Sequence, residues 1–353
     1  MKLFILLAGL ASASVGLAVE TVVLDGEAHY TGLIRKSAKD KAAATYFQPT
    51  VGDIPDAYDS RDFGLVTDIK NQGSCGSCWS FARTRAFESA LIKAGKTTAT
   101  QLDLAEQDAL VNDKSGYGCN GGFMDGDFEV EQGTTTEAVC PYRANHTACN
   151  SASKKFGKAL RWAMVGAANR APTDDELRAA IYQYGTLAVT VAAGSSFDAD
   201  ANGNMRGCGG RGINHMVTLS GYKKATDGSW LYLVGNSWGK SWGMGGYAWS
   251  KKGCNQLASE AGDAALFYYV EDTEPTPPGP TPTALGLPME VVLAKGNEVR
   301  LTVRPKDGYT YTWTPGGAGT YVWVKPSGST TVTLKAKAKD GSVTEQAVRL
   351  TVK

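Results

Sequence analysis

Residues 71–82 read NQGSCGSCWSFA and place two cysteines, Cys75 and Cys78, three positions apart. Apolar side chains recur at helical spacing in and after this stretch, at Trp79, Ala82, Phe87, Ala90 and Leu91. We therefore expect a helix that begins near Cys78 and is capped by Gly95. The positive end of a helix dipole favours the thiolate form of a cysteine at that position. Cys78 is thus the candidate nucleophile of an enzyme.

The two neighbouring cysteines could instead form a redox or metal-binding pair. The chain has seven cysteines, namely Cys75, Cys78, Cys119, Cys140, Cys149, Cys208 and Cys254. An odd number leaves one thiol free in an oxidising compartment, which argues against a simple bridge between Cys75 and Cys78. A redox pair would also leave the histidine and asparagine described next without a role.

A nucleophilic cysteine needs a histidine as its base, and the chain has only three histidines. His29 lies close to the N-terminus and His146 lies between two cysteines, whereas His215 begins an apolar strand in RGINHMVTLSGY. Asn236 ends another apolar strand 21 residues later, where it could orient the imidazole. Trp238 and Trp242 follow it and could shield that hydrogen bond from water. The order Cys78, His215, Asn236 predicts nucleophilic catalysis.

Composition and termini limit the other possibilities. The 353 residues carry 36 basic and 35 acidic side chains, and the resulting net charge of +1 gives no reason to expect a nucleic-acid partner. Residues 1–18 have the pattern of a signal peptide, with Lys2, a short apolar run and then small residues. That run is too short to span a membrane. We expect the secretory pathway, with an extracellular, lysosomal or vacuolar destination.

Changes in composition divide the rest of the chain. Residues 19–53 are weakly patterned, with one helix-like stretch in KSAKDKAAATYF, and residues 54–272 read as a dense α+β domain. Residues 273–284 include TEPTPPGPTPT, a proline-rich linker of polyproline II type. Residues 285–353 alternate apolar and polar side chains between turn signals, which predicts an all-β, immunoglobulin-like sandwich. Its aromatic stretches YTYTW and TYVWVK are either core or a binding platform.

The motifs NQGSCGSCWSFA, GCNGGFMDG, INHMV and GNSWGKSWGMGGY occur in this order within residues 54–270. Together they resemble the papain-like cysteine peptidases, with the cathepsin L group as the nearest likeness. The resemblance implies a two-lobed α+β fold with a helical left lobe and a β-barrel-like right lobe. It also implies a monomeric endopeptidase that acts on proteins and peptides and needs no metal or organic cofactor.

The resemblance assigns a role to each matching residue. Cys78 becomes the nucleophile and His215 its partner, as a thiolate–imidazolium pair, while Asn236 orients the imidazole. Gln72 resembles the glutamine that stabilises the oxyanion together with the backbone N–H of Cys78. The reaction would be acyl transfer through a thioester that water then hydrolyses. Trp238 would border the substrate site.

The resemblance also suggests how the cysteines pair. Cys75 would bridge to Cys119, which leaves Cys78 free, and Cys208 would bridge to Cys254. Many relatives have a cysteine at the position of Asn112 that bridges to the position of Cys149. Because this chain lacks it, we expect a local Cys140–Cys149 disulfide. Asn145 lies in the only glycosylation sequon, Asn145-His146-Thr147.

By the same resemblance, substrate backbone would lie against three glycines and a side chain would enter an apolar S2 pocket. The glycines are Gly76, Gly121 and Gly122, and the pocket walls are Phe123, Met124 and Ile213. Two alignments of GCNQLASEAG put either Ser259 or Glu260 at the pocket floor. A glutamate there would let the pocket accept arginine as well as leucine or phenylalanine.

Residues 19–53 correspond to the pro-segment of a zymogen, but they are shorter than is usual in the cathepsin L group. Inhibition by this segment is therefore expected to be weak or to work differently. Two arginines in the central helix, Arg83 and Arg85, have no explanation in the sequence. A catalytically silent relative that serves as a binding or structural protein is the alternative to the peptidase, although such relatives usually lose the cysteine or the histidine. The C-terminal domain would bind a surface, a carbohydrate or a protein, or act as a spacer.

Overall fold

The computed structural model describes most of the chain, in residues 19–49, 54–114, 116–150, 156–262, 266–269, 290–293, 299–302, 308–319 and 321–352. The expected signal peptide (1–18), the linker (273–284) and the junction at residues 50–53 lie outside the described residues. Within them, no helix is long and apolar enough to cross a membrane.

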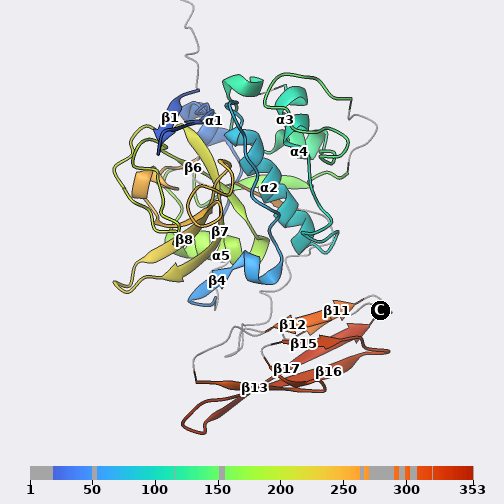
Figure 1. Ribbon diagram of the computed structural model, residues 1–353. Coiled ribbons are helices and arrows are strands. Elements are labelled where there is room, and N and C mark those ends of the chain that lie inside the picture. The colour runs from blue at the N-terminus through green and yellow to red at the C-terminus, as the bar shows by residue number, and fades with distance from the viewer. Residues whose placement is uncertain are drawn as a thin grey trace, which may run out of the picture.

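Helix α2 (Cys78–Lys93) runs through the middle of the larger domain (Figure 1). It begins at Cys78, and Gly95 follows its end with φ of 68°, a left-handed conformation that favours glycine. The sequence suggested one apolar face, but every residue from Cys78 to Ile92 is buried. The reason is that α2 packs against strands on one side and against α3 (Glu106–Asn112) on another.

The two arginines of α2 are buried in networks of polar groups. The guanidinium of Arg83 lies 2.8 Å from carboxylate oxygens of both Asp113 and Glu129, and its exposed fraction is 0%. Arg85 donates to the carbonyl of Thr67 at 2.8 Å and to the hydroxyl of Tyr247. Buried charges require such partners, so these contacts account for both residues.

The remaining elements of the helical lobe are short. They are the 3-10 helix η2 (Gly118–Asn120) and α4 (Asp127–Glu131). Figure 1 draws α3 and α4 together on one side of α2. An apolar cluster around α2 includes Trp79, Phe87, Leu104 and Phe128, so α2 forms the core of this lobe.

An eight-stranded sheet forms the other lobe, in the order β3-β5-β10-β6-β7-β8-β9, with β4 paired to β7. Its strands are β3 (Tyr46–Phe47), β4 (Ala57–Asp59), β5 (Arg161–Val165), β6 (Leu187–Val191), β7 (His215–Lys224), β8 (Trp230–Gly235), β9 (Tyr247–Lys251) and β10 (Leu266–Tyr269). The 3-10 helix η1 (Ser60–Phe63) follows β4 and contacts β7 of the sheet. The 3-10 helix η3 (Cys254–Gln256) follows β9. Helix α5 (Asp174–Tyr184) packs against β7 and begins with a capping box between Thr173 and Glu176.

Residues 19–49 are built into this domain. Strands β1 (Thr21–Leu24) and β2 (Glu27–Tyr30) form a hairpin whose Val22 and Leu24 are buried in the core of the sheet lobe. Helix α1 (Ala38–Ala43) follows, as the sequence indicated, and β3 joins the edge of the large sheet by parallel pairing with β5. The segment therefore has its own docked structure, although its sequence is weakly patterned.

The C-terminal strands form two further sheets. One has the order β11-β17-β16-β13-β14 and the other pairs β12 with β15. Their bounds are β11 (Glu290–Leu293), β12 (Val299–Thr302), β13 (Thr310–Thr314), β14 (Gly317–Ala318), β15 (Tyr321–Val324), β16 (Thr330–Lys337) and β17 (Val343–Val352). Trp313, Val322, Leu334 and Leu350 lie in one buried cluster. Side chains from both sheets thus share a core.

Candidate functional site

Cys78 is completely buried at the first residue of α2. All seven cysteines lie in the described residues, and the structure contains the disulfides Cys75–Cys119, Cys140–Cys149 and Cys208–Cys254. Cys78 is therefore the one free thiol. Because Cys75 is bonded to Cys119, the two cysteines of the motif are not a redox pair in this structure.

His215 and Asn236 meet as the sequence suggested. His215 opens β7 and Asn236 follows β8, and because β7 and β8 are paired their ends bring imidazole Nε2 within 2.9 Å of Asn236 Oδ1. Trp238 covers this pair, with its ring centroid 4.8 Å from that of His215. Trp238 and Trp242 are both buried and exclude water from the bond. Among the described residues, Nδ1 of His215 has no hydrogen-bond partner.

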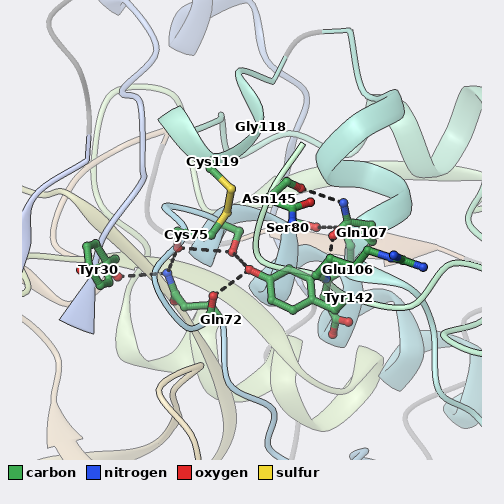
Figure 2. The surroundings of a disulfide bond; sticks show 12 residues. Tyr30, Gln72, Cys75, Ser80, Glu106, Gln107, Gly118, Cys119, Tyr142 and Asn145 are labelled. Carbon is green, nitrogen blue, oxygen red and sulfur yellow. Dashed lines mark hydrogen bonds between the residues drawn. A yellow bond between two sulfur atoms is a disulfide. The ribbon is translucent and has the colours of Figure 1, made fainter. Parts of the chain in front are cut away.

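Gln72 is buried and fixed on both sides of its amide (Figure 2). Its Oε1 accepts from the hydroxyl of Ser237 at 2.6 Å, and its backbone oxygen accepts from the hydroxyl of Tyr142 at 2.8 Å. Its Nε2 donates to the carbonyl of Cys75 at 2.8 Å and to the carbonyl of Tyr30 at 3.0 Å. The Gln72 amide is therefore held in place and donates to a peptide carbonyl of the N-terminal segment.

Tyr30 belongs to the N-terminal segment, which runs across the site. The N–H groups of Gly32 and Leu33 donate to the carbonyl of Asn214, at 3.3 and 3.0 Å. Gly122 donates to the carbonyl of Gly32 at 2.9 Å and accepts from Ile34 at 2.8 Å. These bonds form a parallel β-bridge between Leu33 and Gly122. Residues 30–34 thus occupy the site as an extended peptide.

Two glycines allow this close approach. A Cβ on Gly32 would lie 2.0 Å from the carbonyl oxygen of Gly76, and a Cβ on Gly76 would lie 2.7 Å from the carbonyl oxygen of Thr31. Real Cβ atoms do not approach backbone so closely, so only glycine fits at either position. Gly121 has φ of 112° and precedes the bridge residue Gly122. Of the three glycines expected to face a substrate, Gly76 and Gly122 therefore contact the N-terminal segment here, whereas the backbone of Gly121 bonds to Tyr117 and Gly118.

The side chain of Leu33 fills an apolar pocket. It is 4% exposed and shares a buried cluster with Met124, Ile213 and Met216. Phe123, which the sequence also put in this wall, is partly exposed and instead packs edge-on against Tyr117, with ring centroids 6.2 Å apart. Met124, Ile213 and Met216 thus belong to the same buried apolar cluster as Leu33, whereas Phe123 does not.

The two candidates for the floor of this pocket differ in their contacts. Ser259 donates to the carbonyl of Gln256 at 2.9 Å, which ties its hydroxyl to its own turn. The Glu260 carboxylate forms an ion pair with Arg35, two residues after Leu33, and lies 3.7 Å from Lys41 Nζ. Glu260 is thus the residue of the two that reaches the N-terminal segment.

Burial controls the protonation of the central pair. It raises the pKa of the Cys78 thiol to about 12, although hydrogen bonds with the backbone of Met216 and Gly32 oppose this. Burial also lowers the pKa of His215 to about 4, against the opposing effect of Asn236. Both shifts disfavour the ionic thiolate–imidazolium pair in this buried arrangement.

The position of His29 could not be predicted from the sequence. Its ring stacks on Trp238 at 4.6 Å between centroids, on the residue that also covers His215. Nothing in the sequence placed His29 there, because its position depends on the β1–β2 hairpin.

Asn145, the expected glycosylation site, accepts through its backbone oxygen from Gln107 at 2.8 Å.

The comparisons with known proteins agree with this geometry. A family model described as papain family cysteine protease matches residues 54–266. The chain is 35% identical over 231 residues to the senescence-specific cysteine protease SAG12 of Arabidopsis thaliana, covering 62% of this chain and 64% of that protein. It is 34% identical over 245 residues to vignain of Vigna mungo, covering 67% and 66%. The chain thus spans slightly less than two thirds of the length of these two relatives.

A solved structure of a related protein has a similar fold. The digestive procathepsin L 3 of the Tenebrio molitor larval midgut superimposes with a TM-score of 0.54 and 25% sequence identity. The match covers 65% of this chain and 75% of that chain.

Proposed function

Since the chain belongs to the papain family of cysteine proteases, we propose that it is the zymogen of a cysteine endopeptidase. The observation that carries this proposal is that a peptide already lies in the site. The Tyr30 carbonyl accepts from Gln72 at 3.0 Å, His215 is paired with Asn236, and the free thiol of Cys78 contacts the backbone of Met216, the residue after His215. This arrangement supports Cys78 as nucleophile, His215 as general base and acid, Asn236 as its orienting partner and Gln72 as oxyanion donor.

In the proposed reaction, the Cys78 thiolate attacks the carbonyl carbon of the substrate peptide and Gln72 stabilises the resulting oxyanion. His215 donates a proton to the leaving amine, which leaves a thioester on Cys78. Water deprotonated by His215 then hydrolyses the thioester and returns the free thiol. Trp238 and Trp242 keep bulk water away from the His215–Asn236 bond throughout.

The N-terminal segment would inhibit this reaction until it is removed. It contacts Cys78 through the backbone of Gly32, and burial raises the pKa of the Cys78 thiol. The short length of the segment suggested weak inhibition, but the docked hairpin, the bridge to Gly122 and the ion pair of Arg35 with Glu260 support firm binding.

The contacts of the segment also support a preference at the second position before the cleaved bond. Leu33 occupies the apolar pocket, which favours leucine and similar side chains there. The Glu260–Arg35 ion pair supports Glu260, rather than Ser259, as the charged group near that pocket. We infer that the site accepts leucine best and tolerates arginine.

The test is the kcat/KM of the self-processed enzyme on fluorogenic Leu-Arg and Arg-Arg dipeptide reporters, with Cys78→Ser as control. We expect both to be cleaved, Leu-Arg faster, and neither by the control. A Glu260→Gln variant should lose activity on Arg-Arg but keep it on Leu-Arg. If correctly processed enzyme cleaves neither peptide, the chain is the catalytically silent alternative.

The three disulfides support a route through an oxidising compartment, and so the secretory pathway, with an extracellular, lysosomal or vacuolar destination. We also infer a β-sandwich accessory domain at the C-terminus. Its Tyr311 and Trp313 are buried, whereas Tyr321 and Trp323 on β15 are 49% and 58% exposed. These two side chains support binding to a carbohydrate or protein surface. A Tyr321→Ala, Trp323→Ala double variant should then lose activity on insoluble substrates only.

A further inference from the structure

Lys36, three residues after Leu33, occupies a second site next to the apolar pocket. Its ammonium group lies 3.2 Å from Asp125 Oδ2 and 5.6 Å from the centroid of the Trp162 ring. Asp125 directly follows Met124, which lines the pocket that Leu33 fills. A carboxylate and an aromatic face around one ammonium group form a cation-binding arrangement, which we name the Asp125 site.

The two members of the Asp125 site are held in place. The Asp125 residue is 2% exposed, its Oδ1 has no hydrogen-bond partner among the described residues, and that atom lies 3.4 Å from Arg83 Nη1. The indole N–H of Trp162 donates to the Asp127 carboxylate at 2.6 Å. The ring packs on Gly126, where a Cβ would lie 2.5 Å from the indole. Only glycine lets the ring lie so close to the backbone beside Asp125.

The charges around Asp125 favour a cation. Arg83 is shared by three carboxylates, those of Asp113, Asp125 and Glu129. Lys36 is the second cation of this group. Burial raises the pKa of Glu129, and Arg83 opposes this shift. Departure of Lys36 with the N-terminal segment leaves the buried Asp125 carboxylate with one cation, the guanidinium of Arg83, which it shares with two other carboxylates. Because a buried carboxylate depends on charged partners, the loss of Lys36 is unfavourable.

The order of contacts along the segment fixes where a substrate would use this site. Gly32 lies at Cys78, Leu33 lies in the apolar pocket, and Lys36 lies beyond it. Counted along the segment, the Asp125 site therefore lies farther from Cys78 than the apolar pocket does. A substrate whose second residue before the cleaved bond fills the pocket would reach the Asp125 site with its third or fourth residue before that bond.

We propose that, once the N-terminal segment has left, the Asp125 site binds a lysine or arginine side chain of the substrate at the third or fourth position before the cleaved bond. This proposal rests on the proposed endopeptidase function and adds a second specificity determinant to it. Asp125 supplies the charge and Trp162 supplies a face for the alkyl stem and the cation. Lys36 mimics this side chain in the zymogen.

The test compares fluorogenic peptides on the self-processed full-length enzyme. The peptides are acetyl-Leu-Arg, and acetyl-Leu-Arg extended by one or two residues that carry lysine or norleucine at the third or fourth position. We expect lysine to raise kcat/KM about five- to tenfold over norleucine at one of the two positions. The preference should disappear in Asp125→Asn and persist in Asp227→Asn, a control that removes a surface carboxylate in the turn between β7 and β8.

A second measurement uses the unmodified enzyme, so that it holds even if Asp125→Asn does not fold. A synthetic peptide of residues 29–41 should inhibit about five- to tenfold less well when norleucine replaces Lys36. Equal kcat/KM for lysine and norleucine at both positions, or equal inhibition by the two synthetic peptides, would overturn the Asp125 site. Failure of the enzyme to cleave acetyl-Leu-Arg at all would instead overturn the endopeptidase function.

Discussion

Gly32 is the residue on which the covered state of the site depends most directly. A Cβ added to Gly32 would lie 2.0 Å from the carbonyl oxygen of Gly76. The Gly32 backbone also contacts Cys78 and Asn214. A contact with rigid backbone cannot be relieved by turning a side chain. The segment must therefore shift away from Cys78 if any other residue replaces Gly32.

We expect Gly32→Ala to weaken docking of the N-terminal segment by about 1–3 kcal/mol, roughly five- to 150-fold in the docking equilibrium. The full-length variant should cleave a Leu-Arg reporter without processing, at a rate well above that of the unmodified chain. Gly194→Ala is the matched control, since a Cβ there meets nothing within 4 Å. Equal latency of the Gly32 variant and the unmodified chain would contradict the covered geometry.

The residues that could be predicted from the sequence are those whose role is indicated by the residues next to them in the chain. Cys78 is the first residue of a helix whose start the sequence pattern indicates, and Asn236 follows an apolar strand. Leu33, Lys36 and His29 could not be predicted, because their positions depend on a path across the other lobe. A local sequence pattern cannot predict which side chain of an extended segment will contact a pocket formed by residues about 90 and 180 positions away.

Among the elements, helix α2 contributes to both the site and the core, because its first residue is Cys78 and its second turn carries the buried charge of Arg83. Arg83 has an exposed fraction of 0% and contacts carboxylates from the α3–η2 loop, from the residue before Gly126 and from α4. The arginine therefore ties α2 to the elements that also carry Met124 and Asp125. Loss of its charge would remove the shared cation of these buried carboxylates and leave Asp125 with Lys36.

We expect Arg83→Met to lower the free energy of unfolding by about 3–5 kcal/mol, the usual cost of removing one partner of a buried ion pair. Urea denaturation followed by fluorescence would measure it. Arg206→Met removes an exposed arginine that pairs with Asp198 and should change the midpoint very little. A similar small change for both variants would show that the Arg83 cluster contributes no more than a surface pair.

Elements were predictable where local signals were strong. The long strands β6, β7, β8 and β9 and the start of α2 follow from apolar runs and glycine ends. The sequence TDDE at residues 173–176 contains the capping box of α5, a start signal that could have located this helix. The strands β1 and β2 have only four residues each and are stabilised by burial of Val22 and Leu24 against the sheet lobe. Such short strands give too little alternation to be predicted.

At the scale of the whole molecule, the N-terminal segment couples the covered state to acidity. His29 is half-buried on Trp238, and burial lowers its pKa, while Glu27 and Asp198 raise it in part. His29 and His215 also disfavour each other's charge. The docked segment therefore disfavours the charged form of His29, whereas release of the segment would return its pKa towards the ordinary value of about 6.5.

The sign of the effect follows from linkage. Because the docked state has the lower pKa, docking has its full stability above pH ~6.5 and loses it as the pH falls below that value. We expect His29→Phe to keep the stacking on Trp238 but to lose this part of the acid response. Both chains would carry Cys78→Ser to prevent processing, and hydrogen–deuterium exchange of residues 29–36 would be compared at each pH. The ratio of wild-type to variant exchange should rise as the pH falls from 7.5 to 5, because intrinsic exchange and the titration of groups common to both chains cancel. A ratio that stays constant over this range would mean that release depends on other groups, such as His215 or the carboxylates that pair with Arg35 and Lys36.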